Sequence, residues 1–309
     1  MPRSERQVPS VYFGRPGSLV TLPWPRGEID RTYERPTSDF ITGSGQHQVS
    51  SLPVGSRLHV LSWNVLHADT YGLLEQYHLG QMGYGPWAFG DPALTNMLLP
   101  NQSGATSAFN DARQWKTDGI AYGTPLSNSD SEYIHRTGAP RSLRWSFTTA
   151  VGTDPKVFPT APYRSWAGFP VVPGLSYTWS FWVRTAGFGA ADLQAFARMD
   201  WNTALGGGVG AATGISTTFG FWTKLSVTGT APNGAAFVQP SIEAVETAPL
   251  VSGVSIYVDE PLLEQDSVAN TWAGGGGARP VEILSLTERG TFDARWRQGV
   301  TLTLRELTT

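Results

Sequence analysis

The stretch Tyr177-Thr-Trp-Ser-Phe-Trp-Val183 alternates large apolar side chains with smaller polar ones along most of its length. A period of two is typical of a β-strand with one buried face, here formed by Tyr177, Trp179, Phe181 and Val183. Residues 141–259 repeat this alternation between glycine- and proline-rich turns. The further apolar positions are Leu143, Trp145, Phe147, Leu193, Ala195, Ala197, Met199, Trp201, Phe221, Leu225, Val227, Val238, Ile242, Ala244, Val254, Ile256 and Val258. We predict seven or so short strands that form a β-sandwich.

The N-terminal part also favours strands. Its clearest strand is Arg57-Leu-His-Val-Leu-Ser-Trp-Asn-Val-Leu66, in which His59 shares a face with apolar residues. We expect His59 to be packed or at the surface rather than to bind a metal. Residues 69–79 predict one short helix, with Asp69 as its N-cap and Gly80 as its end. The fold class is therefore all-β with one short helix.

The C-terminal part predicts two strands, at residues 280–284 and 299–307, that follow a glycine-rich segment. This segment, Trp272-Ala-Gly-Gly-Gly-Gly-Ala-Arg279, favours a flexible hinge. Two isolated strands are not stable alone, so they must join a sheet elsewhere, and the first domain is the obvious host. We therefore predict a discontinuous domain of residues 1–100 plus 275–309, interrupted by a sandwich with its linkers at 101–274. Residues 101–140, polar and glycine-rich, are predicted as a linker or an irregular approach to the sandwich.

The composition of the chain limits the classes of function that it can have. Charged residues make up 15% of the 309 residues, below the roughly one quarter of an average protein, as suits a chain covered by neighbours in an assembly. The net charge of -3 gives no reason to expect nucleic-acid binding. The absence of cysteine excludes disulfides and thiolate chemistry. No apolar run is long enough for a membrane span, and no signal peptide is visible at the start, so we expect synthesis in the cytoplasm.

No motif for catalysis stands out. The five histidines form no HExxH pair, and Gly206-Gly-Gly lacks the helix and lysine of a phosphate-binding loop. The carboxylate pairs Asp200 with Glu243 and Asp259 with Glu260 are candidates for glycoside hydrolysis. Solvated charges on the polar faces of strands explain them better. We therefore expect no enzyme activity.

Tryptophans are the candidates for ligand binding, because flat aromatic rings stack on the apolar faces of sugars. Trp182 and Trp222 point away from the apolar sets of their strands. Three interpretations stay open for them: a contact with another subunit or domain, plain surface, or sugar stacking. Trp201 is a third candidate for sugar stacking.

Three successive segments carry a resemblance over about the first hundred residues. The strand at 57–66 and the short helix are followed by Gly80-Gln-Met-Gly-Tyr-Gly-Pro-Trp-Ala-Phe-Gly-Asp-Pro92 and then by Asn96-Met-Leu-Leu-Pro-Asn-Gln-Ser103. This order resembles the distal-tail-like minor tail proteins of phages with long non-contractile tails. The middle of the chain, ending in Val254-Ser-Ile-Tyr-Val-Asp-Glu-Pro-Leu-Leu-Glu264, resembles the jelly-roll carbohydrate-binding modules.

The resemblance implies a virion protein of the tail tip. It implies a homo-oligomeric ring, usually a hexamer, that joins the tail tube to the baseplate or receptor-binding apparatus. Other tail-tip proteins (tail tube, tape measure, baseplate hub) are the implied partners, and the outward jelly roll would touch host glycans. A glycan-binding adhesin is the alternative, and a tail-associated glycan hydrolase is a further one. The resemblance also implies a structural calcium ion near Asp259, although no further ligand is matched; no other cofactor is expected.

Overall fold

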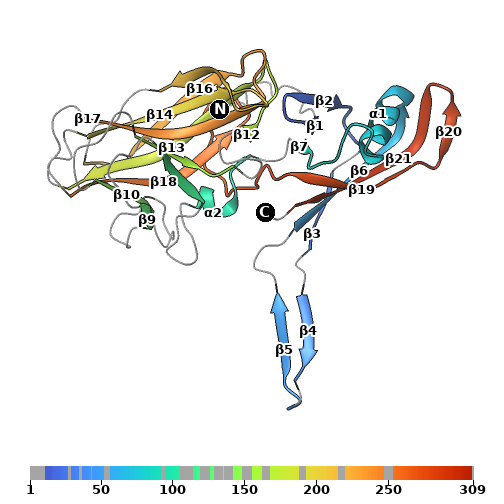
Figure 1. The fold of residues 1–309 in the computed structure, drawn as a ribbon, viewed down its shortest axis with the longest axis horizontal. Coiled ribbons are helices and arrows are strands. Elements are labelled where there is room, and N and C mark those ends of the chain that lie inside the picture. The colour runs from blue at the N-terminus through green and yellow to red at the C-terminus, as the bar shows by residue number, and fades with distance from the viewer. Residues whose placement is uncertain are drawn as a thin grey trace. The chain divides into compact units, whose positions relative to one another are not determined.

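A computed structural model describes residues 11–26, 29–34, 37–42, 44–51, 56–91, 95–104, 114–118, 126–128, 135, 142–147, 155–161, 168–187, 193–214, 220–246 and 253–307. These residues form two compact units. Unit 1 takes the described residues among 1–15, 19–92 and 279–309, and unit 2 takes those among 16–18 and 93–278. Both units are built from antiparallel strands (Figure 1), which confirms the predicted all-β class.

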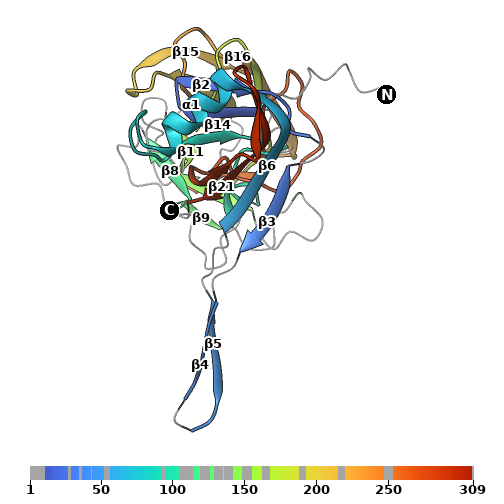
Figure 2. The ribbon, with the colours of Figure 1, turned by 90° about the vertical axis from the view of Figure 1, so that its right-hand side faces the viewer.

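The main sheet of unit 1 brings the two ends of the chain together. Its strand order is β19-β21-β6-β3, and β20 pairs with β21 (Figure 2). Its strands are β3 (Asp30–Glu34), β6 (Ser56–His67), β19 (Val281–Thr287), β20 (Gly290–Asp293) and β21 (Trp296–Glu306). β21 pairs with β6 from Trp296↔His67 to Arg305↔Leu58. Of the C-terminal strands, β21 thus pairs with β6, the clearest strand of the N-terminal sequence, and β19 and β20 pair with β21.

Residues of this sheet form part of the hydrophobic core of unit 1. Leu61, Leu302 and Leu304 are fully buried and belong to one cluster with Phe13, Leu74 and Trp87. Its other elements are the three-stranded sheet β2-β1-β7 and the helix α1. Their bounds are β1 (Val11–Arg15), β2 (Ser18–Leu22), β7 (Ala88–Gly90) and α1 (Ala68–His78).

The helix α1 lies where the sequence predicts one, but it begins differently. The predicted N-cap at Asp69 is wrong: His67 takes that position, and its Nδ1 accepts a hydrogen bond from the Asp69 N–H at 3.3 Å. Asp69 lies instead in the first turn, where its negative charge suits the positive end of the helix dipole. Gly80 follows the helix with a φ of 73°, a left-handed conformation that favours glycine.

Unit 1 also contains a separate two-stranded sheet, formed by β4 (Thr37–Ile41) and β5 (His47–Ser51). No helix in the described part of the chain is both long and apolar enough to span a bilayer.

Unit 2 is a β-sandwich. One sheet has the order β16-β13-β18-β10-β9, and the other has β15-β14-β17-β11-β8 with β12 beside β17. The strands are β8 (Trp115–Asp118), β9 (Leu126–Asn128), β10 (Leu143–Phe147), β11 (Lys156–Pro159), β12 (Phe169–Pro170), β13 (Ser176–Ala186), β14 (Leu193–Asn202), β15 (Gly208–Thr213), β16 (Thr223–Thr230), β17 (Phe237–Glu246) and β18 (Val254–Glu264). The core between the sheets contains Trp145 and Trp179 from the first and Met199 and Ile242 from the second.

Two predictions about the sandwich need correction. β8 and β9 lie inside residues 101–140, which were predicted as linker; Trp115 of β8 reaches the core although its surroundings are polar. Most of the remaining residues of that segment lie outside the described ones. Phe221 is largely exposed and precedes β16, so it does not share the buried face of Leu225 and Val227.

The two ends of unit 2 are tied together. Gly276, Gly277 and Ala278 donate backbone hydrogen bonds to the carbonyls of residues 96, 98 and 97. The Asn96 side chain, fully buried, donates to Pro261 O and Ala273 O. The glycine run predicted as a flexible hinge is therefore fixed by hydrogen bonds, and a Cβ at Gly275 would lie 2.3 Å from Leu98 O.

Candidate functional site

Trp182 and Trp222, two of the predicted sugar-stacking residues, lie against the same histidine of unit 2. The ring of His135 stacks on Trp182 with the centroids 3.9 Å apart and the planes at 18°. Trp222 meets the same ring edge-on at 5.6 Å. One face of Trp182 is thus already covered by a side chain of the protein, so this cluster offers less open aromatic surface than the sequence indicates.

An irregularity in β18 holds His135 in place. The register between β13 and β18 shifts between Ser180↔Leu262 and Trp182↔Asp259, and Glu260 takes a φ of 53° there. The His135 N–H donates to Asp259 Oδ2 at 3.1 Å, and His135 Nδ1 lies 3.4 Å from Glu260 Oε1. Both members of the predicted carboxylate pair, Asp259 and Glu260, therefore contact His135.

The described residues do not fit the calcium ion implied for Asp259. This side chain is fully buried, and its second oxygen accepts the Glu260 N–H at 2.8 Å. Calcium takes a shell of many oxygens, whereas no group of three acidic or histidine side chains lies together in the part of the chain that the structure describes.

Trp201 lies in the core of unit 2. Only 3% of its surface is exposed, and its ring packs edge-on against Tyr177 with centroids 6.0 Å apart. A ring in this position supports the sandwich and presents no face to a ligand.

A row of polar side chains covers the outer face of the second sheet. Because core residues alternate with outward ones, β14 presents Arg198 and Asp200 there, and they pair in register with Ser241 and Gln239 of β17. On the far side of β17, Lys156 of β11 pairs with Glu243. We call these six residues the polar strip: Lys156, Arg198, Asp200, Gln239, Ser241 and Glu243.

Ion pairs organise the polar strip around one guanidinium. Arg198 Nε lies 2.8 Å from Asp200 Oδ1, and Arg198 Nη1 lies 3.4 Å from Glu243 Oε2. Lys156 Nζ approaches Asp200 Oδ2 at 3.5 Å. Burial alone would lower the pKa of Arg198, but its hydrogen bond to Asp200 and the charges of Asp200 and Glu243 outweigh burial and raise it. The strip is thus a fixed array of charged donors and acceptors.

Two buried atoms in the polar strip have no hydrogen-bond partner. Gln239 Oε1 and Ser241 Oγ are both shielded from solvent and unpaired, although Gln239 Nε2 donates to Pro159 O at 3.2 Å. A buried unpaired polar atom costs about 1–3 kcal/mol, so such groups call for an explanation. Phe196, half-buried, stands opposite Glu243 on the same face. The exposed part of the strip therefore consists of charged side chains with an apolar flank, and the two unpaired atoms lie beneath it.

Only two of the six residues of the polar strip are predicted from the sequence as candidate site residues. Asp200 and Glu243 are the predicted carboxylate pair, and the structure brings them together on neighbouring strands. Both contact Arg198, which a hydrolytic mechanism would first have to displace. The sequence signal for Arg198, Gln239 and Ser241 was their alternation with core residues, but alternation alone does not distinguish a binding face from a solvated one.

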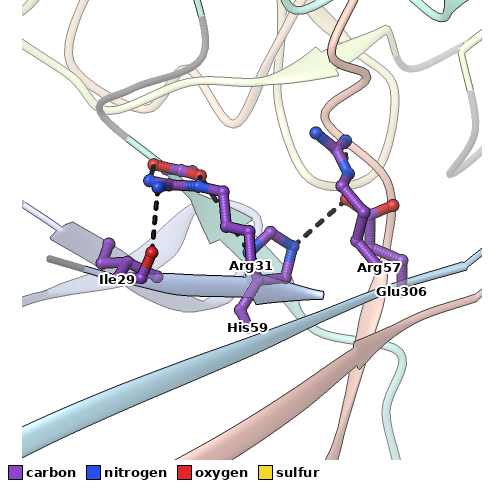
Figure 3. Close-up of polar contacts among 6 residues, drawn as sticks. Ile29, Arg31, Arg57, His59 and Glu306 are labelled. Atoms are coloured by element: carbon purple, nitrogen blue, oxygen red, sulfur yellow. Dashed lines mark hydrogen bonds and ion pairs between the residues drawn. The ribbon is translucent and has the colours of Figure 1, made fainter. Parts of the chain in front are cut away.

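Unit 1 contains a separate cluster of buried charges (Figure 3). We call it the charge cluster: Arg31, Arg57, His59, Asp91 and Glu306. His59 Nε2 lies 3.2 Å from Glu306 Oε1, and His59 Nδ1 lies 4.0 Å from Asp91 Oδ2. Each carboxylate has its own arginine: Arg31 Nε lies 2.6 Å from Asp91, and Arg57 Nη2 lies 2.7 Å from Glu306.

The electrostatics of the charge cluster favour the ionised forms of Glu306, Arg31 and Arg57. Burial alone would raise the pKa of Glu306, but hydrogen bonds and charges from His59 and Arg57 outweigh it and lower the pKa. Hydrogen bonding to Asp91 raises the pKa of Arg31. The cluster joins β3, β6, β21 and the residue after β7, and its side chains are held by one another. The cluster therefore stabilises the fold of unit 1. The packed position expected for His59 is confirmed.

Comparison with known proteins assigns the chain to no family. No protein-family model matches the sequence, and no curated protein is similar to it at a significant level. Among solved structures, the enzymatically active domain of tailspike protein 4 of bacteriophage CBA120 is 14% identical with a TM-score of 0.41, over 56% of this chain and 22% of that one. This chain thus spans about a fifth of that domain's length.

Carbohydrate-binding modules are also similar in fold. The C-terminal family 22 module of Clostridium thermocellum Xyn10B is 15% identical with a TM-score of 0.35, over 52% of this chain and 92% of the module. TmCBM61, solved with β-1,4-galactotriose, is 11% identical with a TM-score of 0.35, over 55% of this chain and 99% of the module. These likenesses concern the fold alone.

Proposed function

We propose that the protein is a non-enzymatic structural component of a phage tail tip. Unit 1 takes its place in a ring, a hexamer by the sequence resemblance, between the tail tube and the baseplate or receptor-binding apparatus. Unit 2 contacts glycans of the host surface. The virion tail is then its location, and the neighbouring tail-tip proteins are its partners.

The tail assignment is supported by the residues that carry the sequence resemblance. Trp87 and Phe89 lie in the core of unit 1, and Asp91 holds Arg31 in the charge cluster. Asn96 ties the two ends of unit 2 together. Trp87, Phe89 and Asp91 thus belong to unit 1, which the C-terminal strands complete, and Asn96 belongs to unit 2, a separate compact unit.

The glycan assignment rests on one observation, the polar strip with its unpaired atoms Gln239 Oε1 and Ser241 Oγ. Both atoms are shielded from solvent, so a sugar hydroxyl pairs with them only after neighbouring side chains of the strip move aside. Asp200, Glu243 and Arg198 extend the same face with acceptors and donors at fixed positions. A polysaccharide presents hydroxyl groups along its whole length, and these hydroxyl groups can pair with the donors and acceptors of the strip.

The test of the glycan assignment is retention of the full-length protein on host cell-wall polysaccharide. The double variant Gln239→Ala/Ser241→Ala removes two neutral hydrogen bonds of about 0.5–1.5 kcal/mol each, which predicts roughly tenfold weaker binding. Ser226→Ala, on an exposed position of the other sheet, is the matched control. Equal retention of all three proteins would remove the glycan role of this face.

The test of the tail assignment is a cryo-EM map of the virion. Density for unit 1 should appear as a ring where the tail tube ends. A virion whose tail lacks this protein would contradict the proposal and would leave a glycan-binding adhesin as the alternative.

A further inference from the structure

The hairpin of β4 and β5 stands apart from the other sheets of unit 1 (Figure 1, Figure 2). Its strands pair in register from Thr37↔Ser51 to Ile41↔His47, and its turn is closed by the Thr42 N–H donating to Gln46 O at 2.9 Å. Among the described residues, no third strand pairs with either of them. Each strand therefore has one edge that no further strand of the described residues covers.

Such a hairpin is poorly stabilised by itself. An isolated two-stranded sheet is marginally stable in water. Proteins protect exposed sheet edges with lysine and other charged residues, or with proline, which cannot donate a backbone hydrogen bond. Residues 37–51 contain no lysine, arginine or proline, and Asp39 is their single charged residue. Ile41, at the end of β4, is 64% exposed. The hairpin thus has the features of a strand pair that is completed by another sheet.

We propose that the β4–β5 hairpin is an assembly arm that adds its open edge to the main sheet of unit 1 in a second copy of the chain. This inference rests on the proposed ring and specifies how its subunits are joined. Backbone hydrogen bonds along the added strand would supply affinity, as in other cases of β-strand addition.

The edge that receives the arm is β19. It is the last strand of its sheet, and among the described residues only Trp87 pairs with it on the outer side, at Val281. Its single charged residue, Glu282, is already engaged by Arg305 at 2.7 Å. Leu284 lies at a register shift of this edge and is 39% exposed. The opposite edge, β3, carries charges at three of its five positions and is protected against pairing.

The arm and its acceptor are different surfaces of one chain, so the contact is heterologous. Contacts of this kind build rings when the rotation closes and open filaments when it does not. The low share of charged residues suits a chain whose surface is covered in this way.

Cysteine cross-linking tests the arm, because the native chain contains no cysteine. Full-length Ile41→Cys and full-length Leu284→Cys are purified separately, mixed and oxidised. We expect a covalent dimer that contains one chain of each, which can form only between copies. The control is Ile41→Cys mixed with Leu205→Cys, whose site in unit 2 is more accessible at 93% exposure. Cross-linking no stronger than in this control overturns the assignment of β19.

Deletion of the arm gives a second, independent measurement. Residues 37–51 are replaced by a short glycine-serine turn, and the mass in solution is determined by light scattering, with the melting of both units as a check of folding. Wild type should be an oligomer and the deletion variant a folded monomer. A deletion variant that keeps the oligomer overturns the arm and leaves the proposed ring standing. A wild-type chain that is monomeric at its highest soluble concentration removes both.

Discussion

His59 Nε2 lies 3.2 Å from Glu306 Oε1, although 247 residues separate them in the sequence. The pair joins β6 to the last residue of β21, and Arg57 contacts the same carboxylate at 2.7 Å. All three side chains are buried. The C-terminal strand of unit 1 is therefore held to the N-terminal half by charge as well as by its backbone ladder.

Glu306→Gln should destabilise unit 1, because Arg57 would stay buried without its carboxylate. Breaking one partner of a buried ion pair costs about 3–5 kcal/mol. The folded state lowers the pKa of Glu306, so its contribution is present above the ordinary value of 4.5 and is lost as the pH falls through the lower folded value. The difference in urea unfolding between wild type and variant should thus shrink below that pH. Equal stability near neutral pH would contradict the role of the pair.

Leu302→Ala should weaken unit 1 by about 2–5 kcal/mol, because Leu302 is fully buried in the core. Hydrogen exchange of the β6 and β21 amides identifies the affected unit. Leu284→Ala, on the partly exposed edge strand of the same sheet, should change stability by no more than about 0.5 kcal/mol. Similar effects of the two substitutions would show that β21 is not central to the fold of unit 1.

Gly275→Ala should destabilise unit 2, whereas Gly274→Ala should have little effect. A Cβ at position 275 would lie 2.3 Å from Leu98 O and 2.6 Å from Leu99 O, so the backbone must shift; at position 274 nothing lies within 4 Å. Overpacking of this kind costs about 1–3 kcal/mol. Thermal melting of the two variants measures it. If both melt as wild type does, the glycine run is a free hinge after all.

Trp182→Ala should lower the melting temperature of unit 2 without changing glycan retention. The substitution removes the stack with His135, and aromatic pairs contribute about 0.5–1.5 kcal/mol beyond their buried area. Retention on cell-wall polysaccharide, measured beside the Gln239→Ala/Ser241→Ala variant, separates the two surfaces. A folded Trp182→Ala protein that no longer binds would favour the aromatic cluster as the sugar site.

Alternation along strands was sufficient to predict the all-β class and much of the core. Tyr177, Trp179 and Phe181 are buried on one face, as are Val300 and Leu302 near the C-terminus. The period of two is a local property, so it can be read from one segment at a time. The helix also follows from local spacing, and its cap was misplaced by two residues because a histidine nitrogen took the place expected for a carboxylate.

The candidate site could not be predicted in the same way, because it depends on which strands are neighbours. β14 and β17 lie side by side although β15 and β16 intervene in the chain, and this pairing brings Arg198 opposite Ser241. The tryptophans were predicted as sugar-stacking residues because their rings are flat. In the structure, however, Trp201 is buried in the core, and His135 covers one face of Trp182. The glycine-rich composition of residues 272–279 predicts conformational freedom of the backbone. The run is fixed nevertheless, because its N–H groups have backbone partners nearby.

The short ladder between residues 96–98 and 276–278 also determines how unit 2 would respond to mechanical load. The first and last described segments of unit 2 meet at this ladder, so a pull on the two ends of the unit loads its backbone hydrogen bonds and those of the Asn96 side chain. Each such bond contributes only about 0.5–1.5 kcal/mol. A drag force on unit 2 would thus be absorbed at its base, and the ladder could close again once the force is released.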